Sequence, residues 1–297
     1  MYPRPFHYHR ASSLREAATM LSQLGENARF LAGGQSLIPL MKLRFSNPSH
    51  LVDLSFVPGT AYIEEESGAL HFGALTRHGE IENSATAAMI PVLHDCAAGI
   101  ADVQVRNRGT IGGSLAEADP SGDWATVLLT QDTELRCLGP KGERTVPLRD
   151  FITDAYTTVL DHEELIREVV VKVPPKGSGG AYLAFKRSAP VYPTASAAVQ
   201  LTLDDGACKD AVIALGCVGL TAVRAKDSED ALRGREIGDK AIAAAMEAAR
   251  TAADPQPDMR GSAEYKRMLV AALVKRAIQI AMRRARGEQV EVGHIYA

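Results

Sequence analysis

Two short segments of this sequence combine paired glycines with small hydroxyl side chains. They are Ala32-Gly33-Gly34-Gln35-Ser36, which follows a short apolar strand at 29–31, and Thr110-Ile111-Gly112-Gly113-Ser114. Glycine lets the backbone approach a ligand closely, and successive N–H groups in such turns form a concave site for an anion. Two such segments could hold the two phosphates of one dinucleotide from opposite sides. An isolated Gly-Gly pair is more often only a turn.

The common nucleotide-binding motifs do not occur in this chain. No G-x-G-x-x-G follows a strand, and no G-x-x-x-x-G-K-[ST] is present. The first absence leaves a Rossmann site unsupported, and the second excludes a P-loop ATPase. A ligand that carries phosphate would therefore need a different fold.

Two acidic residues, Asp119 and Asp123, lie just beyond the second glycine segment. A carboxylate near a diphosphate is repelled unless it faces a sugar hydroxyl or a ring N–H, so hydrogen bonding to ribose or adenine is the functional hypothesis. The alternative is a structural role, because Asp119 precedes Pro120 and Asp123 stands at the start of an expected helix. The residues by themselves favour the turn and cap interpretation for both.

The remaining chemistry-bearing residues form no recognisable group. His7 and His9 alternate on one extended segment, but no third ligand has a suitable spacing. No Ser/His/Asp or Cys/His arrangement is evident, so we predict no catalytic residue and no metal site. No pair of cysteines has C-x-x-C spacing, which argues against a disulfide framework and against a zinc or iron–sulfur site held by this chain alone. The four cysteines are Cys96, Cys137, Cys208 and Cys217.

The composition limits the class of protein. The chain has 297 residues, 33 Lys+Arg and 36 Asp+Glu, which give a net charge of −3. This balance excludes broad electrostatic binding to nucleic acid, and the 5% of aromatic residues disfavours a stacking platform for single strands. No apolar run approaches the ~20 residues of a membrane span, and the N-terminus has no apolar signal core. We therefore expect a cytoplasmic protein of about two domains.

The spacing of apolar residues predicts the elements that position these segments. An amphipathic helix over 14–24 begins at Ser13, which forms a capping-box pair with Glu16. Further predictions are hairpins around 67–68 and 140–142, helices over about 87–100 and 124–131, a long polar loop over 106–123, and a strand over 165–173. The stretch at 174–180, rich in proline and glycine, is the best linker candidate.

The pattern changes after this linker. Strands at 181–187, 195–203 and 211–217 come first, and helices at about 228–233, 239–252 and 262–286 follow. Strands followed by helices predict an α+β domain with helices on one face of an antiparallel sheet. We therefore divide the chain into domains at 1–176 and 177–297, the first with subdomains at about 1–52 and 53–176.

The two glycine segments, together with their flanks, resemble a known family. Residues 32–42 and 100–114 are similar to the two flavin loops of the medium, FAD-binding subunit of molybdenum hydroxylases. The second similarity runs on through Ala118-Asp119-Pro120 to Asp123, and another covers 261–266. Within the family, the chain most resembles the medium subunits of aerobic carbon monoxide dehydrogenases, over essentially its whole length.

This resemblance implies a fold and a set of site residues. The fold is a vanillyl-alcohol-oxidase-type FAD-binding domain of two α/β subdomains, followed by a three-stranded antiparallel sheet with a helical bundle. The FAD diphosphate would lie between 32–36 and 110–114, with Asp119 alongside and Asp123 near the ribityl or adenosine portion. Leu165 and Ile166 would bring backbone to the flavin ring. Lys186 matches the family's flavin-proximal lysine, and Tyr192 the aromatic residue against the isoalloxazine ring.

The resemblance also implies an activity shared between chains. A large partner subunit would oxidise the substrate at a molybdenum-pterin cofactor, and a small subunit with two [2Fe–2S] clusters would pass electrons to the FAD here. A quinone, another acceptor or oxygen would receive them. The assembly would be a dimer of heterotrimers, a heterohexamer, with peripheral contact to a membrane quinone pool as an option. Carbon monoxide, an aldehyde or a heterocycle all remain open as substrate.

Two alternatives to the electron-transfer subunit stay open on the sequence. One is a self-contained FAD-dependent oxidase or reductase of the same fold, which usually needs its own acid/base group. The other is a binding or scaffolding protein that has lost its flavin, against which the intact glycine pairs argue.

Overall fold

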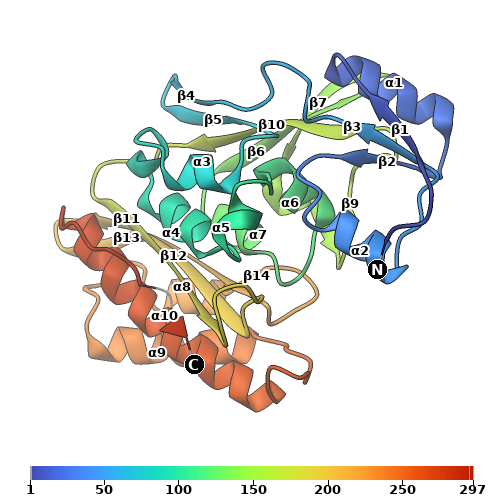
Figure 1. Ribbon diagram of the computed structural model, residues 1–297. Coiled ribbons are helices and arrows are strands. Elements are labelled where there is room, and N and C mark those ends of the chain that lie inside the picture. Colours follow the sequence, from blue (N-terminus) through green and yellow to red (C-terminus); the bar gives the residue numbers. More distant parts are fainter. Residues whose placement is uncertain (1, 294, 297) are drawn as a thin grey trace.

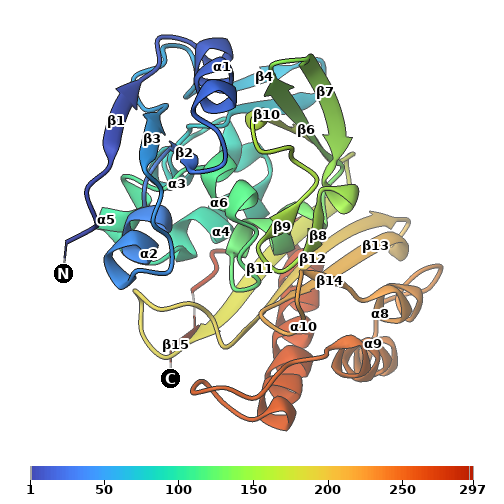
Figure 2. The ribbon, with the colours of Figure 1, turned by 90° about the vertical axis from the view of Figure 1, so that its right-hand side faces the viewer.

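The computed structural model describes residues 2–293 and 295–296. Its strands form three main sheets, which follow one another along the chain (Figure 1). A small parallel sheet comes first, a five-stranded antiparallel sheet follows, and a second five-stranded sheet lies in the C-terminal part. Figure 2 shows the first sheet and the C-terminal helices at opposite ends of the molecule.

The N-terminal sheet has the strand order β1-β3-β2 and carries two helices. The elements are β1 (His7–Arg10), α1 (Leu14–Leu24), β2 (Ala28–Leu31), α2 (Leu37–Leu43) and β3 (His50–Asp53). Helix α1 begins as predicted, because the Ser13 side chain accepts a hydrogen bond from the Glu16 N–H. It ends at Gly25, whose φ of 73° suits glycine. The first glycine segment lies between β2 and α2.

The second sheet has the strand order β4-β5-β10-β6-β7, and all its pairs are antiparallel. Its strands are β4 (Ile63–Glu66), β5 (Ala69–Gly73), β6 (Thr133–Gly139), β7 (Gly142–Pro147) and β10 (Leu165–Lys172). Both predicted hairpins are present in it. Between β5 and β6 lie α3 (His78–Glu82), α4 (Pro91–Gly99), α5 (Val103–Arg106), α6 (Ile111–Glu117) and α7 (Asp123–Leu128). A short pair, β8 (Ile152–Asp154) and β9 (Thr157–Thr158), precedes β10.

Two predictions for this region are wrong. The single helix expected over 87–100 is a 3₁₀ turn at Ala87–Met89 followed by α4, because Pro91 is the first helical residue and starts a new helix. The polar loop expected over 106–123 contains α6. Thr110 caps this helix by accepting a hydrogen bond from the Gly113 N–H, and the cap supports a helix that its two glycines disfavour.

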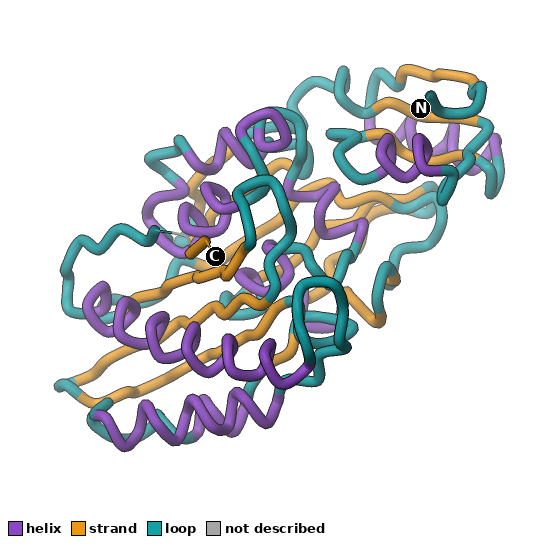
Figure 3. Tube along the Cα trace, turned by 60° about the horizontal axis from the view of Figure 1, so that its bottom comes forward, coloured by secondary structure: helices purple, strands orange, loops and turns teal. Residues whose placement is uncertain are grey.

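The C-terminal sheet has three long antiparallel strands and two short edge strands. They are β11 (Ser178–Lys186), β12 (Ala195–Asp204), β13 (Ala207–Gly216), β14 (Val223–Arg224) and β15 (Ile295–Tyr296). The helices are α8 (Lys226–Asp230), α9 (Asp239–Ala252) and α10 (Ala263–Ala285). Figure 3 shows long helices running along the strands. The expected linker is partly strand. A Cβ on Gly179 would lie 2.2 Å from the Ala281 carbonyl oxygen, so glycine lets α10 pack closely here.

Helices cover both faces of this sheet. Along β11, Tyr182 and Ala184 belong to a core shared with α4 and α7, whereas Ala181 and Leu183 belong to a core shared with α9 and α10. This is the alternation that a strand buried on both sides requires. The predicted one-sided arrangement therefore holds only within the C-terminal part, because the preceding half of the chain covers the other face (Figure 1).

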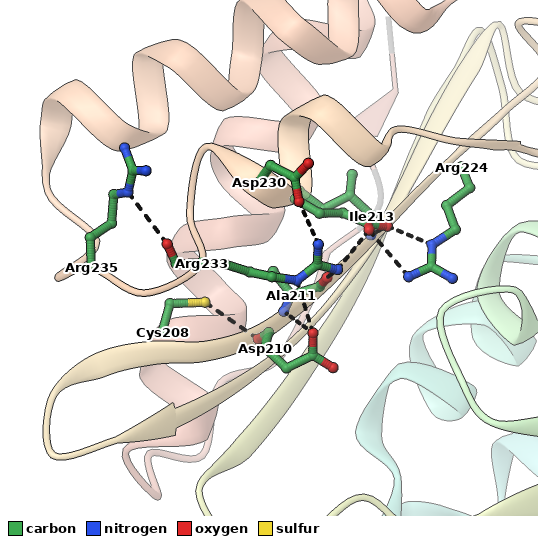
Figure 4. A network of polar contacts seen from close by, with 9 residues as sticks. Cys208, Asp210, Ala211, Ile213, Arg224, Asp230, Arg233 and Arg235 are labelled. Carbon is green, nitrogen blue, oxygen red and sulfur yellow. Dashed lines mark hydrogen bonds and ion pairs between the residues drawn. The ribbon is translucent and has the colours of Figure 1, made fainter.

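A buried carboxylate joins α8 to the C-terminal sheet. Glu229 accepts hydrogen bonds from Arg224 Nε at 2.8 Å, Arg233 Nη2 at 2.8 Å and the Ile213 N–H at 3.1 Å. Arg233 also donates to Asp210 and Asp230 (Figure 4). Since the Glu229 side chain is almost fully buried, these donors replace the water that its charge would otherwise need. The network lies outside the cleft described next.

Candidate functional site

Both glycine segments face one cleft of about 520 Å³. This volume lies within the ~300–1,000 Å³ common for small-molecule sites. Of the predicted site residues, Ile111 alone does not line the cleft, since its side chain is buried in the core beneath. The others line it: Ala32, Gly33, Gly34, Gln35, Ser36, Thr110, Gly112, Gly113, Ser114, Asp119, Asp123, Leu165, Ile166, Lys186 and Tyr192.

The first glycine segment turns sharply between β2 and α2. Gly34 has a φ of +73°, which disfavours any other residue. A Cβ on Gly33 would lie 2.1 Å from the Arg108 carbonyl oxygen, so the segment packs directly against the chain that leads into the second segment. Within the part of the chain that the structure describes, the N–H groups of residues 33–36 donate to no protein acceptor. They are free to bind an anion from the cleft.

The second segment differs from the anion nest that its glycines suggested. The Ile111 N–H donates to the Thr76 carbonyl at 3.0 Å, and the Gly112 N–H donates to the Ala74 carbonyl at 2.9 Å. The Gly113 N–H donates to Thr110 Oγ1 at 3.1 Å. The expectation of consecutive free N–H groups here is therefore wrong, because capping of α6 and contacts with residues 74–76 use them. Gly112 is needed for packing instead, since a Cβ at this position would lie 2.6 Å from the Cβ of Ala74.

The two walls of the cleft nevertheless suit a ligand that carries a diphosphate. The first wall supplies free backbone donors, and the second supplies a surface without side chains at Gly113, flanked by the hydroxyls of Thr110 and Ser114. A narrow space with donors on one side and room for close approach on the other matches the chemistry of a phosphate ester.

Asp119 and Asp123 have different structural roles. Asp119 makes the predicted turn, because its Oδ1 accepts the Ser121 N–H at 2.8 Å. The cap hypothesis for Asp123 is wrong: Gly122 is the N-cap of α7, and Asp123 Oδ1 accepts a hydrogen bond from the Tyr182 hydroxyl at 2.5 Å. Burial raises the pKa of Asp123, while the positive charge of Lys186 lowers it. The Tyr182 hydroxyl belongs to the C-terminal half, so no spacing in the sequence could reveal this bond.

Lys186 is a nearly fully buried cation in the wall of the cleft. Its Nζ donates to the carbonyl oxygen of Gly99, the last residue of α4. The carboxyl end of a helix carries a negative partial charge, which stabilises an ammonium group there. The lysine is thus held at a helix end, with its charge next to the space that a ligand would fill.

The start of β10 and the loop before β12 complete the cleft. Leu165 and Ile166 are buried at a point where β10 bulges against β6, between Ile166 and Glu168. Tyr192 lies in the loop after β11, where the residue is 47% exposed at the mouth of the cleft. Partial burial, followed by the negative charge of Asp119, raises the pKa of Tyr192, so its hydroxyl stays protonated at neutral pH.

His78 also lines the cleft, although nothing in its sequence context predicts this. Its Nδ1 accepts a hydrogen bond from Trp124 Nε1 at 3.0 Å, which leaves the ring proton on Nε2. Burial lowers the pKa of His78 to about 4, so the ring is neutral. A Cβ on Gly109 would lie 2.7 Å from Nε2, which explains a glycine before Thr110. Only the folding of α3 beside the second segment brings these residues together.

Residues 2–293 contain neither a metal-binding cluster nor a membrane-spanning helix. No group of three His, Cys, Asp or Glu side chains in this range could hold a metal ion. No helix described here combines the length and the apolarity needed to cross a bilayer. The four cysteines are free thiols, and burial raises the pKa of Cys137 and of Cys208 to about 11.

The chain is similar to known proteins over nearly its whole length. Residues 4–175 match the family described as FAD binding domain in molybdopterin dehydrogenase, and residues 180–281 match the CO dehydrogenase flavoprotein C-terminal domain. The chain is 39% identical to subunit alpha of the 6-hydroxypseudooxynicotine dehydrogenase complex of Paenarthrobacter nicotinovorans, over 99% of this chain and 100% of that one. It is 38% identical to the carbon monoxide dehydrogenase medium chain of Afipia carboxidovorans, and the match covers 96% of this chain and 100% of that one.

A solved structure has the same fold. A chain of carbon monoxide dehydrogenase from Hydrogenophaga pseudoflava, in a form that lacks the Mo-pyranopterin moiety of the molybdenum cofactor, superposes with a TM-score of 0.93. It is 39% identical, and the match covers 96% of this chain and 99% of that one.

Proposed function

The chain belongs to the family of FAD-binding medium subunits of molybdenum hydroxylases, and from this premise we propose that it carries electrons between two partners. It takes them from the [2Fe–2S] clusters of a small subunit and delivers them to a quinone or another acceptor. A large subunit holds the molybdenum cofactor and oxidises the substrate. FAD, when bound, supplies the redox chemistry that links these steps.

The observation that carries this proposal is the cleft between the two glycine segments. Free N–H groups at 33–36 bind the diphosphate from one side, and Gly113 lets it approach from the other. Lys186 places a positive charge inside the cleft, and Tyr192 covers part of its mouth. These residues bind and orient the cofactor and restrict the access of water.

The thiols support a division of labour between chains. An iron–sulfur cluster needs several thiolates that converge on one point. No group of three His, Cys, Asp or Glu side chains among the described residues could hold a metal ion. In this proposal the iron–sulfur centres therefore belong to another chain.

The substrate is chosen by the large subunit. At 39% and 38% identity, one relative belongs to a 6-hydroxypseudooxynicotine dehydrogenase complex and the other to a carbon monoxide dehydrogenase. Two relatives of nearly equal similarity thus belong to enzymes with very different substrates. This fits a chain whose residues contact the cofactor and the partners but not the molecule that is oxidised.

Purification together with neighbouring gene products tests the proposal. We expect the full chain to bind FAD, to co-purify with a large and a small subunit in equal amounts, and to be reduced only when both are present. Acid precipitation should release the flavin intact. A chain that oxidises a small substrate unaided would favour the self-contained oxidase. A chain that stays colourless after reconstitution with FAD would favour a protein that has lost its cofactor.

Replacing Lys186 with methionine should lower the reduction potential of the bound FAD. The lysine stabilises negative charge that arrives on reduction, and its loss removes this stabilisation. The reduction potential of a two-electron couple changes by ~30 mV for each ~1.4 kcal/mol of stabilisation that the reduced form loses. We therefore expect the potential to fall by roughly 30–60 mV. Lys172→Met is the matched control, because Lys172 is exposed and pairs with Asp132 away from the cleft. The measurement is a spectroscopic redox titration, and equal potentials in both variants would remove Lys186 from the site.

A further inference from the structure

Arg260 reaches from the C-terminal half to the mouth of the flavin cleft. It immediately precedes the segment 261–266, which belongs to the resemblance with the family but has no part in the cleft described so far. Its Nη1 donates to the Pro193 carbonyl oxygen at 2.9 Å and to Ser121 Oγ at 3.2 Å. Its guanidinium carbon lies 5.9 Å from the centre of the Tyr192 ring. One side chain therefore contacts both the loop between α6 and α7 and the loop between β11 and β12.

A rigid turn holds Arg260 in this position. Its own N–H donates to Asp258 Oδ1 at 2.8 Å, and Asp258 and Gly261 exchange two backbone hydrogen bonds of 3.1 Å. The carboxylate of Asp258 also pairs with Lys266 Nζ at 2.9 Å, and the buried Lys266 donates to the Gln256 carbonyl. These bonds connect Asp258 with Arg260, Gly261 and Lys266, and they hold the turn from which the arginine projects.

Glycine is required at the end of this turn. Gly261 has a φ of +156°, and a Cβ there would lie 2.5 Å from the Tyr265 ring. A side chain there would strain the backbone and displace either the Tyr265 ring or the turn that carries Arg260. The glycine of the 261–266 segment therefore serves the placement of the residue before it.

Charges of both signs act on Tyr192 at the mouth of the cleft. The Arg260 guanidinium lies 5.9 Å from the ring centre, and burial, followed by the negative charge of Asp119, raises the pKa of the phenol. The Asp119 carboxylate accepts a hydrogen bond from the Ser121 N–H. Ser121 Oγ in turn accepts a hydrogen bond from the Arg260 guanidinium. The tyrosine ring is therefore oriented by groups from both halves of the chain.

We propose that Arg260 is a positioning residue, which fixes Tyr192 over the mouth of the cleft by tying Ser121 to Pro193. The inference rests on the proposed function, because it concerns the access of solvent to the bound FAD. Arginine suits this role better than lysine, since its planar fork can donate to two acceptors and lie against a ring at once. Without it, the Tyr192 loop moves away from the cleft and leaves the flavin more exposed.

The experiment uses the full-length chain with FAD. The variants are Arg260→Ala, Arg260→Lys, Tyr192→Ala and the double variant Arg260→Ala with Tyr192→Ala. Arg267→Ala is the matched control, because this arginine has a similar exposure (32% against 29%) but contacts Ala253 and Asp254 instead. The readouts are the FAD dissociation constant, the visible spectrum of the flavin and the quenching of its fluorescence by iodide. Circular dichroism verifies that each variant is folded.

We expect Arg260→Ala to weaken FAD binding roughly tenfold, as for the loss of hydrogen bonds to a charged group, and to increase iodide quenching. Arg260→Lys should recover only part of either effect, and Arg267→Ala should change neither. In the Tyr192→Ala background, Arg260→Ala should add little, because the arginine acts through the tyrosine.

Other outcomes would overturn the inference in separable ways. If the wild-type chain binds FAD and Arg260→Ala matches it in spectrum, affinity and quenching, Arg260 has no positioning role and the proposed function stands. If the two substitutions have fully additive effects, Arg260 does not act through Tyr192. If the wild-type chain binds no FAD, the proposed function fails and the inference fails with it.

Discussion

Alanine in place of Gly33 yields a protein that purifies with little FAD and binds added FAD weakly. The new Cβ would lie 2.1 Å from the Arg108 carbonyl oxygen and 2.8 Å from Gly109 Cα, and neither backbone atom can move aside like a flexible side chain. The first segment must therefore shift, and its free N–H groups shift with it. Extra atoms in a packed site cost ~1–3 kcal/mol, so we expect a loss of affinity of roughly tenfold to a hundredfold.

The measurement is a titration of the apoprotein with FAD, followed by absorbance. Gly238→Ala is the control, because a Cβ at that position meets no atom within 4 Å and its φ is −108°. Circular dichroism and thermal unfolding separate a loss of binding from a loss of folding. Equal affinity in the wild type and in Gly33→Ala would contradict the placement of the diphosphate between the two segments.

Local features of the sequence sufficed to predict many elements. Ser13 and Gly25 delimit α1 because a side-chain cap and a glycine with positive φ depend on neighbouring residues only. The hairpin turns and the long C-terminal strands follow from turn residues and from apolar runs. The two glycine segments were also visible, since each is contiguous in the chain. Their convergence on one cleft was expected from the resemblance to the family.

The rest depends on contacts between distant parts of the chain. The Gly112 N–H donates to the Ala74 carbonyl. The Tyr182 hydroxyl donates to Asp123, which lies 59 residues away in the sequence. His78 and Arg260 enter the site only because α3 and the turn before α10 fold against the loops of the cleft. None of these residues has a spacing that marks it. The sequence therefore predicted the position of the cleft better than the bonding within it.

A buried ion pair connects the two halves of the chain, and breaking it should have a large effect on stability. Arg284 of α10 binds Asp95 of α4 through two bonds of 2.6 and 2.9 Å, and it also donates to the Gly180 carbonyl at 2.7 Å. Asp95 and Arg284 have side-chain exposures of 1% and 8%. Arg284→Met would leave a buried carboxylate without its cation, so we expect a loss of ~3–5 kcal/mol in the free energy of unfolding.

Two further changes identify the cause of this loss. Asp95→Leu combined with Arg284→Met removes both charges and should restore much of the stability, because an apolar pair can replace a buried ion pair. Lys172→Met breaks an exposed pair and should cost less than ~1 kcal/mol.

Burial already raises the pKa of Asp95, and the loss of Arg284 raises it further. The deficit should therefore shrink as the pH falls, because the protonated acid is less costly to bury.

Urea unfolding followed by two probes also tests the proposed division at residues 176 and 177. Trp124 is the single tryptophan and lies in α7, so its fluorescence reports on the first half, whereas far-ultraviolet circular dichroism reports on both. One face of the C-terminal sheet forms a core with α4 and α7, and Tyr182 donates its backbone N–H to Asp95. The halves should therefore unfold together, and Arg284→Met should shift both transitions equally. Separate transitions in the wild type would instead show two domains that are stable on their own. The ion pair between Asp95 and Arg284 would then join the domains without contributing to either core.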